Sequence, residues 1–517
     1  MAGRGIMTTT SSFEIMREKG VIYVDKTALI YRMVSGTDNA FFLSRPRRFG
    51  KSLLVSTLKA FFEGRKDLFE GLAISELEKD WLKYPVFKFD MSNMKNDPIH
   101  RLDEKLRCIL GEYEAIYGNG ENETTPSSKL IGLIKRARAA TGQRAVVLID
   151  EYDTPLLDSV MDKPTLDAMR NKLRDFYGVL KERTDDLRFV FITGITKFSQ
   201  LSIFSAMSNL VNISMKDEYA SICGISKDEL LTELRPEIAA MAEKLHISES
   251  TAISRLKKKY DGYHFTKNSP DIYNPLSLLR SLKDGEFNHY WYSTGTPTHV
   301  TQMLSKYTIQ PEELEGFPAT LNMFDVPLEQ AETPIPLLYQ SGYLTIKSVR
   351  GVRYTLGFPN EEVRLSFLQG LMPYYSKKTG NDNEIFLSDL TLAFEEKRVD
   401  DAMELLRSFF SSIPYDAERQ DEDHYKTMFY LIFRLASAFE VRTEERSAAG
   451  RCDALIETDD TIYLFEFKLE GSAEDALKQI DDKGYAIPYE AGDKNIVKIG
   501  VNFEKDKRTI ERWVVSN

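Results

Sequence analysis

FLSRPRRFGKS, residues 42–52, is the stretch that decides the fold of this chain. It follows the pattern of a phosphate-binding loop, which is Gly, four residues, then Gly-Lys-Ser or Gly-Lys-Thr. Gly50 to Ser52 are in place, but Arg45 stands where the first glycine belongs. An apolar run, residues 40–43, precedes the loop, and residues 53–62 have apolar side chains at helical spacing. Strand, tight loop and helix are the context that the motif requires, and they predict an α/β fold with a parallel sheet.

The residue types in this loop suit a nucleotide phosphate. The N-terminus of a helix offers free N–H groups and the positive end of the helix dipole. Gly50 lets the backbone approach the anion, Lys51 can reach the β- and γ-phosphates, and the Ser52 hydroxyl can ligate Mg²⁺. On these residues alone, a chance tripeptide at a helix start is the alternative.

A second apolar run, AVVLIDE at residues 145–151, ends in two acids. It predicts a buried strand that delivers carboxylates to the C-terminal edge of the sheet, where open α/β sheets bind ligands. We expect Asp150 to hold Mg²⁺, mostly through water, and Glu151 to orient or deprotonate the attacking water. The alternative is a helix N-cap at Asp150 or Asp153, with Pro155 close behind. Because both motifs occur in order, each after a strand, the sequence predicts nucleotide binding.

Further apolar runs complete the expected sheet. One ends at Thr193, and residues 85–90 and 210–214 predict two more strands. Thr193, Thr196 or Lys197 would then lie near the sheet edge, as candidates to sense the γ-phosphate. A polar exit from strand to loop is the alternative for each of the three.

Composition excludes several classes of protein. The 517 residues suggest about two to four domains, and 42% hydrophobic with 28% charged residues is typical of a water-soluble globular protein. No apolar run reaches about eighteen residues, so no membrane-spanning helix is expected. The N-terminus lacks the apolar core of a secretory signal, and the three cysteines are too scattered for a disulfide framework or zinc site, so a cytoplasmic location is expected. The net charge of −11 argues against a generally basic, nucleic-acid-coating protein, but not against a local basic groove.

The patterns divide the chain into four regions. Residues 1–215 hold the strands and helices of the phosphate-binding sheet, and residues 216–330 are mostly helical and suit a lid. Residues 331–415 contain a helix and hairpin that resemble a winged helix, followed by a helical connector over 387–410. Their few lysines and arginines favour packing over DNA contact. Residues 416–517 predict a small α/β domain. The aromatic turn YDGYHF, from Tyr260 to Phe265, is interpreted as a packed hydrophobic turn rather than a ligand site.

Two strands near the C-terminus carry a second set of charged residues. Residues 450–456 and 461–468 predict an antiparallel hairpin. Because side chains alternate along a strand, Glu466 and Lys468 share a face that Asp453 on the neighbouring strand can meet. An amphipathic hairpin with solvated charges is the alternative, but Glu466 and Lys468 interrupt an otherwise strongly apolar strand.

Asp, then Glu-x-Lys, is the constellation of metal-dependent nucleases. Asp453 and Glu466 would hold one or two Mg²⁺ ions, which lower the pKa of a bound water and stabilise charge on the scissile phosphate. Lys468 would position that water or neutralise developing charge. Glu422, ahead of an apolar helix, and Gln479, on a helix after the hairpin, are further candidates for the same site.

The whole chain resembles the bacterial predicted AAA-ATPase proteins, whose C-terminal domain belongs to the PD-(D/E)xK nuclease superfamily. The matching stretches are Tyr23–Thr27, Ser44–Leu54, Leu148–Asp158, Phe191–Ser205, Tyr260–Phe265, Gly450–Asp453 and Glu466–Lys468. The resemblance makes Arg45 part of the family's pattern. It implies ATP and Mg²⁺ at Gly50, Lys51, Ser52, Asp150 and Glu151, and a nuclease-like site at Asp453, Glu466 and Lys468, with Glu422, Glu444 and Gln479 as weaker matches.

Three functions are compatible with these observations. The first is an ATP-regulated, Mg²⁺-dependent nuclease in DNA processing or defence, in which ATP hydrolysis biases the arrangement of lid and nuclease domain. The second is an ATP-driven switch whose nuclease-like domain only binds nucleic acid or a protein partner, because several folds of this superfamily have lost activity. The third is a structural or signalling ATPase that acts on proteins. Assembly into a homo-oligomer is a further expectation, with Arg45, Arg47 and Arg48 as candidates to contact phosphate or a neighbouring subunit.

Overall fold

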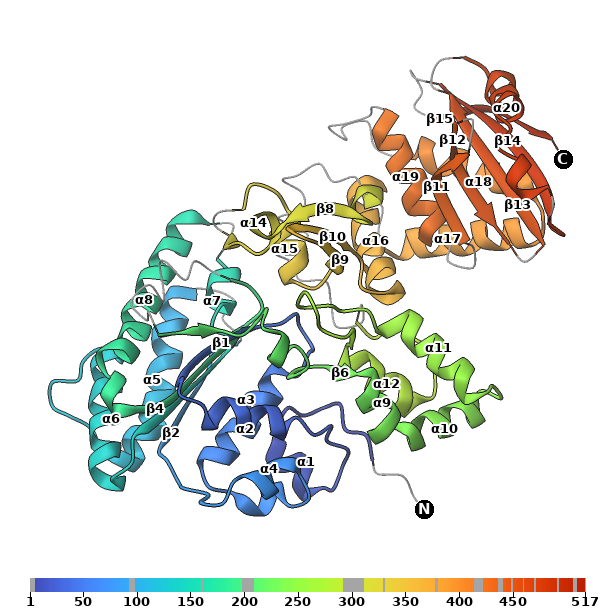
Figure 1. Cartoon of the computed structure of the whole chain (residues 1–517). Helices are drawn as coiled ribbons and strands as arrows, with labels where there is room; N and C mark the ends of the chain where they lie inside the picture. The colour runs from blue at the N-terminus through green and yellow to red at the C-terminus, as the bar shows by residue number, and fades with distance from the viewer. Residues whose placement is uncertain are drawn as a thin grey trace. The chain divides into compact units, whose positions relative to one another are not determined.

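The computed structural model of this chain has two compact units. It describes residues 5–92, 98–159, 162–197, 209–291, 311–328, 331–376, 380–412, 422–435, 440–447, 450–458, 460–468, 471–490, 492–504 and 509–516. The first unit holds the described residues of Met1–Tyr307 and Gly316–Arg364, and the second holds those of Thr308–Glu315 and Leu365–Asn517. Figure 1 labels the helices and strands of both units.

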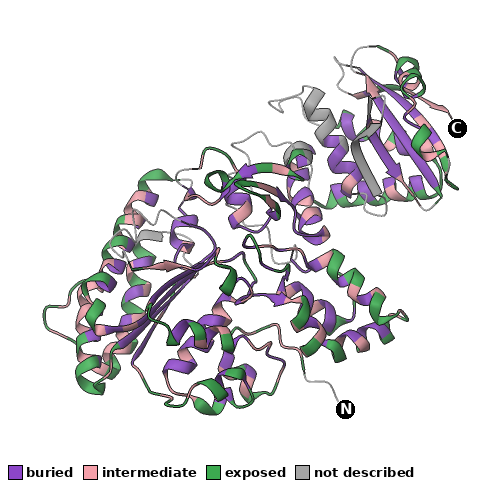
Figure 2. Ribbon diagram, in the orientation of Figure 1, coloured by how far each residue is buried: buried purple, intermediate pink, exposed green. Residues whose placement is uncertain are grey.

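The described part of the first unit is built on a five-stranded sheet in which all paired strands run parallel. Its strands are β1 (Ala40–Ser44), β2 (Val86–Asp90), β3 (Ala145–Asp150), β4 (Leu187–Gly194) and β5 (Val211–Asn212), in the order β2-β3-β4-β1-β5. The strands expected from the apolar runs are confirmed. Every residue of β3 is buried, and Figure 2 shows the sheet buried along its length, as expected when helices cover both faces.

The helices that accompany the sheet lie on both of its faces (Figure 1). They are α1 (Phe13–Glu18), α2 (Thr27–Ser35), α3 (Lys51–Phe62), α4 (Ala73–Leu77), α5 (Pro98–Tyr117), α6 (Pro126–Thr141), α7 (Thr154–Leu157) and α8 (Lys163–Glu182), with the 3₁₀ turns η1 (Lys66–Phe69) and η2 (Thr184–Asp186). The chain runs from β1 outward to the edge strand β2 and returns through β3 to β4. Because crossovers are right-handed, this reversal puts α3 on one face and α5, α6 and α8 on the other.

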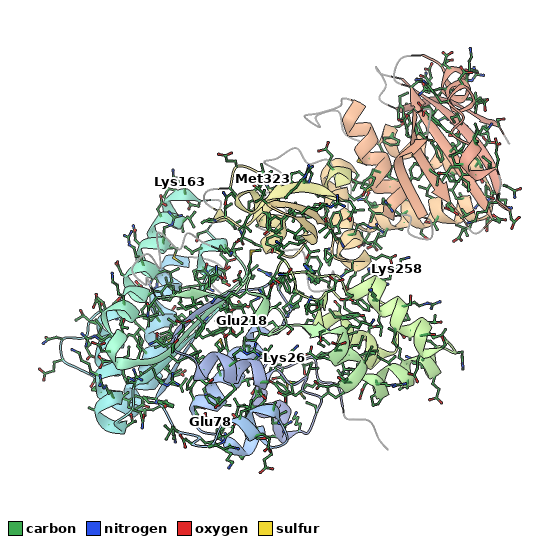
Figure 3. The ribbon with its side chains drawn as sticks, in the orientation of Figure 1. Lys26, Glu78, Lys163, Glu218, Lys258 and Met323 are labelled. Carbon is green, nitrogen blue, oxygen red and sulfur yellow. The ribbon has the colours of Figure 1, made fainter. Side chains whose placement is uncertain are left out.

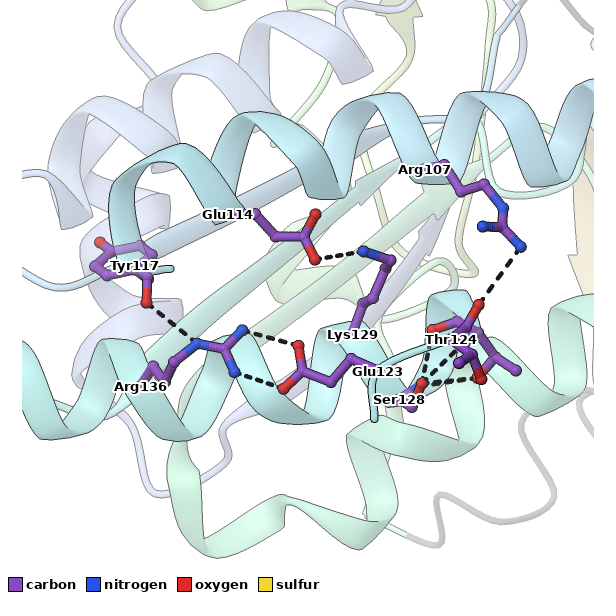
Figure 4. A network of polar contacts seen from close by, with 9 residues as sticks. Arg107, Glu114, Tyr117, Glu123, Thr124, Ser128, Lys129 and Arg136 are labelled. Atoms are coloured by element: carbon purple, nitrogen blue, oxygen red, sulfur yellow. Dashed lines mark hydrogen bonds and ion pairs between the residues drawn. The ribbon is translucent and has the colours of Figure 1, made fainter. Parts of the chain in front are cut away.

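Helices α5 and α6 are tied together by partly buried polar contacts (Figure 4). Lys129 forms an ion pair with Glu114, and Arg136 contacts Glu123 through both of its terminal nitrogens. Arg136 Nε also donates to the Tyr117 carbonyl at 3.1 Å. A planar guanidinium that bonds a carboxylate in this way holds its partner in one orientation. The contacts therefore fix the helix pair that leads the chain from β2 to β3.

A helical region follows β5 and has its own hydrophobic core. Its elements are η3 (Asp217–Tyr219), α9 (Lys227–Glu233), α10 (Arg235–Lys244), α11 (Glu249–Tyr260) and α12 (Pro275–Asp284), with the antiparallel strands β6 (Ile225–Ser226) and β7 (Ile272–Tyr273). Leu230, Ile238 and Leu278 are fully buried in one cluster. Lys26, labelled in Figure 3, precedes α2 and forms an ion pair of 2.5 Å with Glu229 of α9. This contact joins the helical region to the elements around the sheet.

A small antiparallel sheet completes the described residues of the first unit. Its strands are β8 (Phe317–Thr320), β9 (Thr345–Arg350) and β10 (Arg353–Gly357), in the order β8-β10-β9, and α14 (Leu321–Phe324) and α15 (Ile335–Gln340) lie between β8 and β9 in the chain. The predicted helix and hairpin are both present, and β8 adds a third strand that the sequence did not predict.

The second unit is a sheet with helices around it. Its elements are η5 (Pro311–Leu314), α16 (Glu361–Ser376, from its fifth residue), α17 (Gly380–Glu395), α18 (Val399–Ser411), α19 (Glu422–Leu435), β11 (Glu440–Ser447), β12 (Gly450–Glu457), β13 (Thr461–Lys468), α20 (Ala473–Asp482), η7 (Ile487–Tyr489), β14 (Asn495–Glu504) and β15 (Thr509–Ser516). The described strands follow the order β11-β12-β13-β14-β15, and all neighbours are antiparallel except β13 and β14. The predicted hairpin, β12–β13, is confirmed. The parallel pair is joined by α20.

The helical connector expected over residues 387–410 consists of two helices. Helix α17 ends at Glu395 and α18 begins at Val399. Lys397 has a backbone φ of 58°, in the left-handed region where a helix ends rather than continues. Across both units, none of the helices in the described ranges is long and apolar enough to cross a bilayer.

Candidate functional site

The loop between β1 and α3 has the backbone of an anion-binding turn. Gly50 precedes the first residue of α3 with a φ of 87°, and Arg48 has a φ of 68°. Glycine adopts such values at little cost, whereas for arginine they are strained. The turn brings the chain from the end of β1 directly to the N-terminus of α3, whose first N–H groups have no partners within the helix.

Lys51 is folded back over this loop. Its side chain is 7% exposed, and Nζ donates to the carbonyls of Arg45 at 2.9 Å and Pro46 at 3.0 Å. Burial lowers the pKa of Lys51, while the charges of Asp150 and Glu151 raise it. The ammonium therefore lies beside both acids that the sequence placed at the end of β3.

Asp150 and Ser52 lie together, as the two motifs predict. Asp150 is 2% exposed; burial raises its pKa, and a hydrogen bond from Ser52 and the charge of Lys51 lower it. One carboxylate oxygen, Oδ1, is buried without a hydrogen-bond partner among the described residues. A buried carboxylate oxygen beside a serine hydroxyl fits a hard divalent cation. No group of three or more His, Cys, Asp or Glu in the described ranges could hold a metal ion, so Mg²⁺ here would take further oxygens from phosphate and water.

Glu151 follows Asp150 in a strained conformation. Its φ is 52°, which is unusual for a residue with a side chain and is found most often at functional sites. Thr154 Oγ1 donates to Glu151 Oε2 at 3.3 Å. The left-handed turn directs the chain away from the strand, and the Glu151 side chain lines the cavity beside the loop.

Asp153 occupies the N-cap position of α7 but does not cap it through its side chain. Its Oδ2 instead accepts hydrogen bonds from the backbone N–H of Ile195 at 3.0 Å and from the N–H and hydroxyl of Thr196, each at 2.6 Å. The alternative interpretation of a side-chain cap is therefore wrong for Asp153. The residue holds the chain that leaves β4 against the chain that leaves β3.

The three candidates to sense the γ-phosphate all bond to the protein itself. Thr193 Oγ1 donates to the Leu43 carbonyl at 2.8 Å, between β4 and β1. Thr196 bonds to Asp153, and Lys197 forms an ion pair with Asp325. Each of the three side chains is at most 8% exposed. These contacts do not favour a direct phosphate contact for Thr193.

A cavity of about 550 Å³ lies beside the loop, within the usual range of ligand sites. The predicted residues that line it are Arg48, Gly50, Lys51, Ser52 and Glu151, together with Arg47. Arg45 is not among its lining residues: its side chain is 2% exposed and donates to backbone carbonyls of the chain. This placement does not favour the predicted contact of Arg45 with phosphate. Burial, and then the positive charges of Arg47 and Arg280, lower the pKa of Arg48. The three arginines therefore lie close enough to repel one another, and an anion bound among them would relieve this repulsion.

Part of the cavity wall was not predicted from the sequence. Thr8, Thr10 and Ser11 of the N-terminal segment line it, and so do Leu276 and Leu279 of α12. Neither stretch carries a local motif for ligand binding, because only the fold brings both of them beside the loop. They give the cavity a polar and an apolar lining besides its basic residues, which suits the sugar and base of a nucleotide.

The C-terminal residues also come together, around the end of β13. The Gln479 side chain on α20 donates through Nε2 to Glu466 Oε1 and accepts at Oε1 from Lys468 Nζ at 2.5 Å. Glu466 is 3% exposed. Burial, followed by the charges of Glu466 and Asp453, raises the pKa of the neighbouring Cys452 thiol to about 12. A carboxylate pair, a lysine and a glutamine therefore share one small region, as the spacing predicted.

Asp453 lies where the two strands of the hairpin separate. The antiparallel register runs from Glu457↔Ile462 to Ala454↔Phe465, while β13 stays paired with β14 as far as Lys468. Beyond Phe465, the backbone N–H of Phe467 donates to Asp453 Oδ2 at 2.9 Å. The end of β13 that carries Glu466 and Lys468 is therefore not paired through its backbone with β12. Glu422 begins α19 and Glu444 lies in β11, but the placement of these two side chains lies outside the described structure.

Comparisons with known proteins match the two regions of the chain that contain these residues. A family model described as predicted AAA-ATPase matches residues 7–204, and one for the PD-(D/E)XK nuclease superfamily matches residues 420–513. A protein of Azotobacter chroococcum mcd 1, named "Uncharacterized protein in vnfD 5'region", is 33% identical over 518 residues, which cover 96% of this chain and 95% of that protein. The chain belongs to the predicted AAA-ATPase family, with a PD-(D/E)XK nuclease superfamily domain at its C-terminus.

The two matched ranges contain nearly all of the candidate site residues of this predicted AAA-ATPase. The loop, Asp150 and Glu151 fall in the first range, and Asp453 to Gln479 in the second. The cavity wall from α12 falls in neither. The α/β fold of both parts is thereby established.

Proposed function

We propose that the first unit binds ATP with Mg²⁺ in the 550 Å³ cavity and hydrolyses it. The observation that carries this proposal is the meeting of Ser52 and Asp150 at the N-terminus of α3, with Lys51 and Glu151 beside them. A serine hydroxyl, a buried carboxylate and a helix N-terminus form the combination that a Mg²⁺-bound triphosphate requires. When bound, Mg²⁺ would neutralise part of the phosphate charge.

Each residue of the loop then has a role. The Lys51 ammonium would exchange the carbonyls of Arg45 and Pro46 for phosphate oxygens, which are stronger acceptors because they are charged. Arg48 lines the same cavity and would add positive charge. Glu151 is the group in the described wall best suited to orient and deprotonate water. The polar N-terminal segment and the apolar side of α12 would hold the nucleoside.

We propose further that the C-terminal domain is a Mg²⁺-dependent nuclease acting on DNA. Asp453 and Glu466 would hold the ion, which would lower the pKa of a bound water when present. Lys468 would hold that water or neutralise charge on the phosphate. The support is the split between β12 and β13, which leaves a carboxylate on each strand at the same end of the hairpin. A role in DNA processing or defence, regulated by ATP, would follow.

One observation favours a second candidate, an ATP-driven switch whose C-terminal domain binds nucleic acid without cutting it. Glu466 and Lys468 are both bonded to Gln479, so the side chains that would act on a substrate are already engaged by a third side chain. Such an arrangement suits a nuclease-like domain that still binds nucleic acid but no longer cleaves it.

Two assays on the full-length chain test these proposals. Calorimetric titration with ATP and Mg²⁺ should give binding that Lys51→Ala abolishes, and unchanged binding by that variant would refute the loop assignment. Supercoiled plasmid with Mg²⁺ or Mn²⁺, with and without ATP, should be nicked by the wild type and not by Glu466→Ala or Lys468→Ala. Binding of the plasmid without any cut would favour the switch.

A further inference from the structure

Arg45, which replaces the first glycine of the loop motif, points into the protein. Its Nη1 donates to the carbonyls of Ser44 at 2.9 Å and Ser214 at 2.8 Å. Its Nη2 donates to the carbonyls of Tyr219 at 3.3 Å and Ala220 at 3.4 Å. Burial lowers the pKa of Arg45 to about 10, so the guanidinium remains charged at neutral pH. Four carbonyl acceptors compensate the two terminal nitrogens of this buried charge, whereas Nε is buried without a hydrogen-bond partner among the described residues.

Apart from that of Ser44, the carbonyls that Arg45 bonds come from the chain that follows β5. Ser214 also accepts a hydrogen bond from the Ser44 N–H at 2.9 Å, through its side-chain oxygen. Strand β1 is therefore fastened at its end to the segment from Ser214 to Ala220 by main-chain and side-chain bonds. The phosphate-binding loop starts from this fixed point.

The far end of the loop rests on the same aromatic turn as Arg45. The Arg45 guanidinium lies 4.2 Å from the centre of the Phe265 ring. Phe49 packs edge-on against Tyr263 at 4.7 Å and against Phe265 at 5.2 Å between ring centres. Arg45 and Phe49 are the two ends of the segment that precedes Gly50, and both contact Phe265. The aromatic turn is thus the floor on which the loop lies.

The loop backbone between these ends is also enclosed. A side chain at Gly342 would place its Cβ 2.6 Å from Cβ of Pro46, so only glycine allows that approach. Lys51 Nζ bonds to the carbonyls of Arg45 and Pro46 from within the loop. The carbonyl of Phe49 accepts from the Gly224 N–H at 3.1 Å. Contacts from four separate parts of the chain therefore converge on residues 45–49.

From these contacts we infer that Arg45 is a positioning residue that fixes the loop, so that the N–H groups of Gly50 to Ser52 and the Lys51 ammonium face a phosphate without rearrangement. In a common phosphate-binding loop the first glycine gives the turn its shape, whereas here a buried guanidinium and its aromatic floor hold it. The inference rests on the proposed ATP site. It has a consequence that the motif alone would not suggest: restoring the missing glycine should loosen the loop and weaken ATP binding.

The test uses the full-length chain and two measurements on Arg45→Gly. The first is hydrogen exchange of the loop amides, residues 45–54, without nucleotide, and the second is calorimetric titration with ATP and Mg²⁺. We expect exchange about tenfold faster and ATP affinity about tenfold weaker. Arg45→Lys keeps the charge but replaces the planar fork with one ammonium, so both effects should be about threefold. This second variant decides the question if Arg45→Gly does not fold.

The control is Arg188→Gly. Arg188 lies on β4 of the same sheet, donates to the Val34 carbonyl at 2.9 Å, and lies 5.9 Å from the Tyr84 ring centre. It resembles Arg45 in its contacts but belongs to the beginning of its strand, away from the loop. Arg188→Gly should lower the thermal stability of the protein. Its hydrogen exchange at residues 45–54 and its ATP affinity should both stay within about twofold of the wild-type values. An equal effect of both variants on the loop would overturn the inference, as would unchanged or tighter ATP binding by Arg45→Gly.

The exchange measurement separates this inference from the proposed function. If the wild type binds no ATP, the proposed function fails, and faster exchange in Arg45→Gly alone still supports the fixing of the loop. If the wild type binds ATP and exchange in Arg45→Gly is unchanged, the ATP site stands and the role of Arg45 is refuted.

Discussion

Ser52, in the first turn of α3, lies beside Asp150, the last residue of β3, and lowers the pKa of its carboxyl group. The two residues belong to motifs nearly a hundred positions apart, and the parallel sheet brings them to one edge. Burial raises the pKa of Asp150, whose Oδ1 has no hydrogen-bond partner among the described residues. A buried carboxylate with an unpartnered oxygen is stabilised strongly by a cation that binds to that oxygen.

Asp150→Asn should therefore remove the dependence of ATP binding on Mg²⁺. The amide has the shape of the carboxylate but lacks its charge, so ATP affinity with Mg²⁺ should fall about tenfold or more, while affinity in EDTA should change little. Calorimetric titration under both conditions measures the difference. Asp90→Asn is the matched control, because Asp90 pairs with Asp150 in register on β2 and is exposed. A variant Asp150→Asn that kept its Mg²⁺ dependence would exclude Asp150 from the metal site.

Glu151→Gln should bind ATP and fail to turn it over. The glutamine keeps the size of the side chain and its contact with Thr154, but it cannot accept a proton from water. Removal of a general base lowers the rate by about 10²–10⁴-fold, so single-turnover hydrolysis should slow by that factor with ATP affinity within about threefold. Hydrolysis at the wild-type rate would show that another group activates the water.

Local patterns predicted the parts of the site that follow one another along the chain. The strand, loop and helix around Gly50 and the strand ending at Asp150 were found because hydrophobic periodicity and motif spacing are local properties. The direction of the Arg45 side chain was not found, because its acceptors on residues 214–220 come near only after the sheet has formed. The same holds for Asp153, whose partners lie beyond the neighbouring strand.

The C-terminal site was predicted for a similar reason and with a similar limit. Alternation along β13 put Glu466 and Lys468 on one face, and the hairpin brought Asp453 beside them. The separation of β12 from β13 beyond Phe465 has no signal in the local sequence. It depends on the Asp453 side chain, which accepts the Phe467 N–H in place of a backbone carbonyl. The break between α17 and α18, where Lys397 turns left-handed, was not predicted either.

Glu362→Gln should make the first unit more stable at alkaline pH than the wild type. Glu362 is 1% exposed, accepts from the Trp291 N–H at 2.7 Å, and has a pKa that burial raises from 4.5 to about 7. Because the folded pKa is the higher one, the stability that this group contributes is complete below pH 4.5 and is lost as the pH rises through 7. At pH 8 the loss amounts to at most about 3 kcal/mol.

Urea unfolding of Glu362→Gln and wild type at pH 5 and pH 8 measures this effect. The variant should gain unfolding free energy relative to the wild type between the two pH values, because glutamine carries no charge to desolvate. Glu361→Gln is the control at the neighbouring, less buried position, and it should show no such gain. A constant difference between Glu362→Gln and wild type across the range would mean that Glu362 is ionised throughout.

Gln479→Ala should weaken the C-terminal site without unfolding it. Gln479 bonds Lys468 at 2.5 Å and also bonds Glu466, so it sets the distance between the two charged groups. Without it, Lys468 can pair directly with Glu466 and compete with a metal ion for the carboxylate. Calorimetric titration with Mn²⁺ should show affinity lower by about tenfold, as for other residues that orient a metal ligand. Lys478→Ala, at the exposed position before it on α20, should leave the affinity unchanged. Tighter Mn²⁺ binding by Gln479→Ala would show instead that the glutamine blocks the site, and would favour the non-cutting switch over the nuclease.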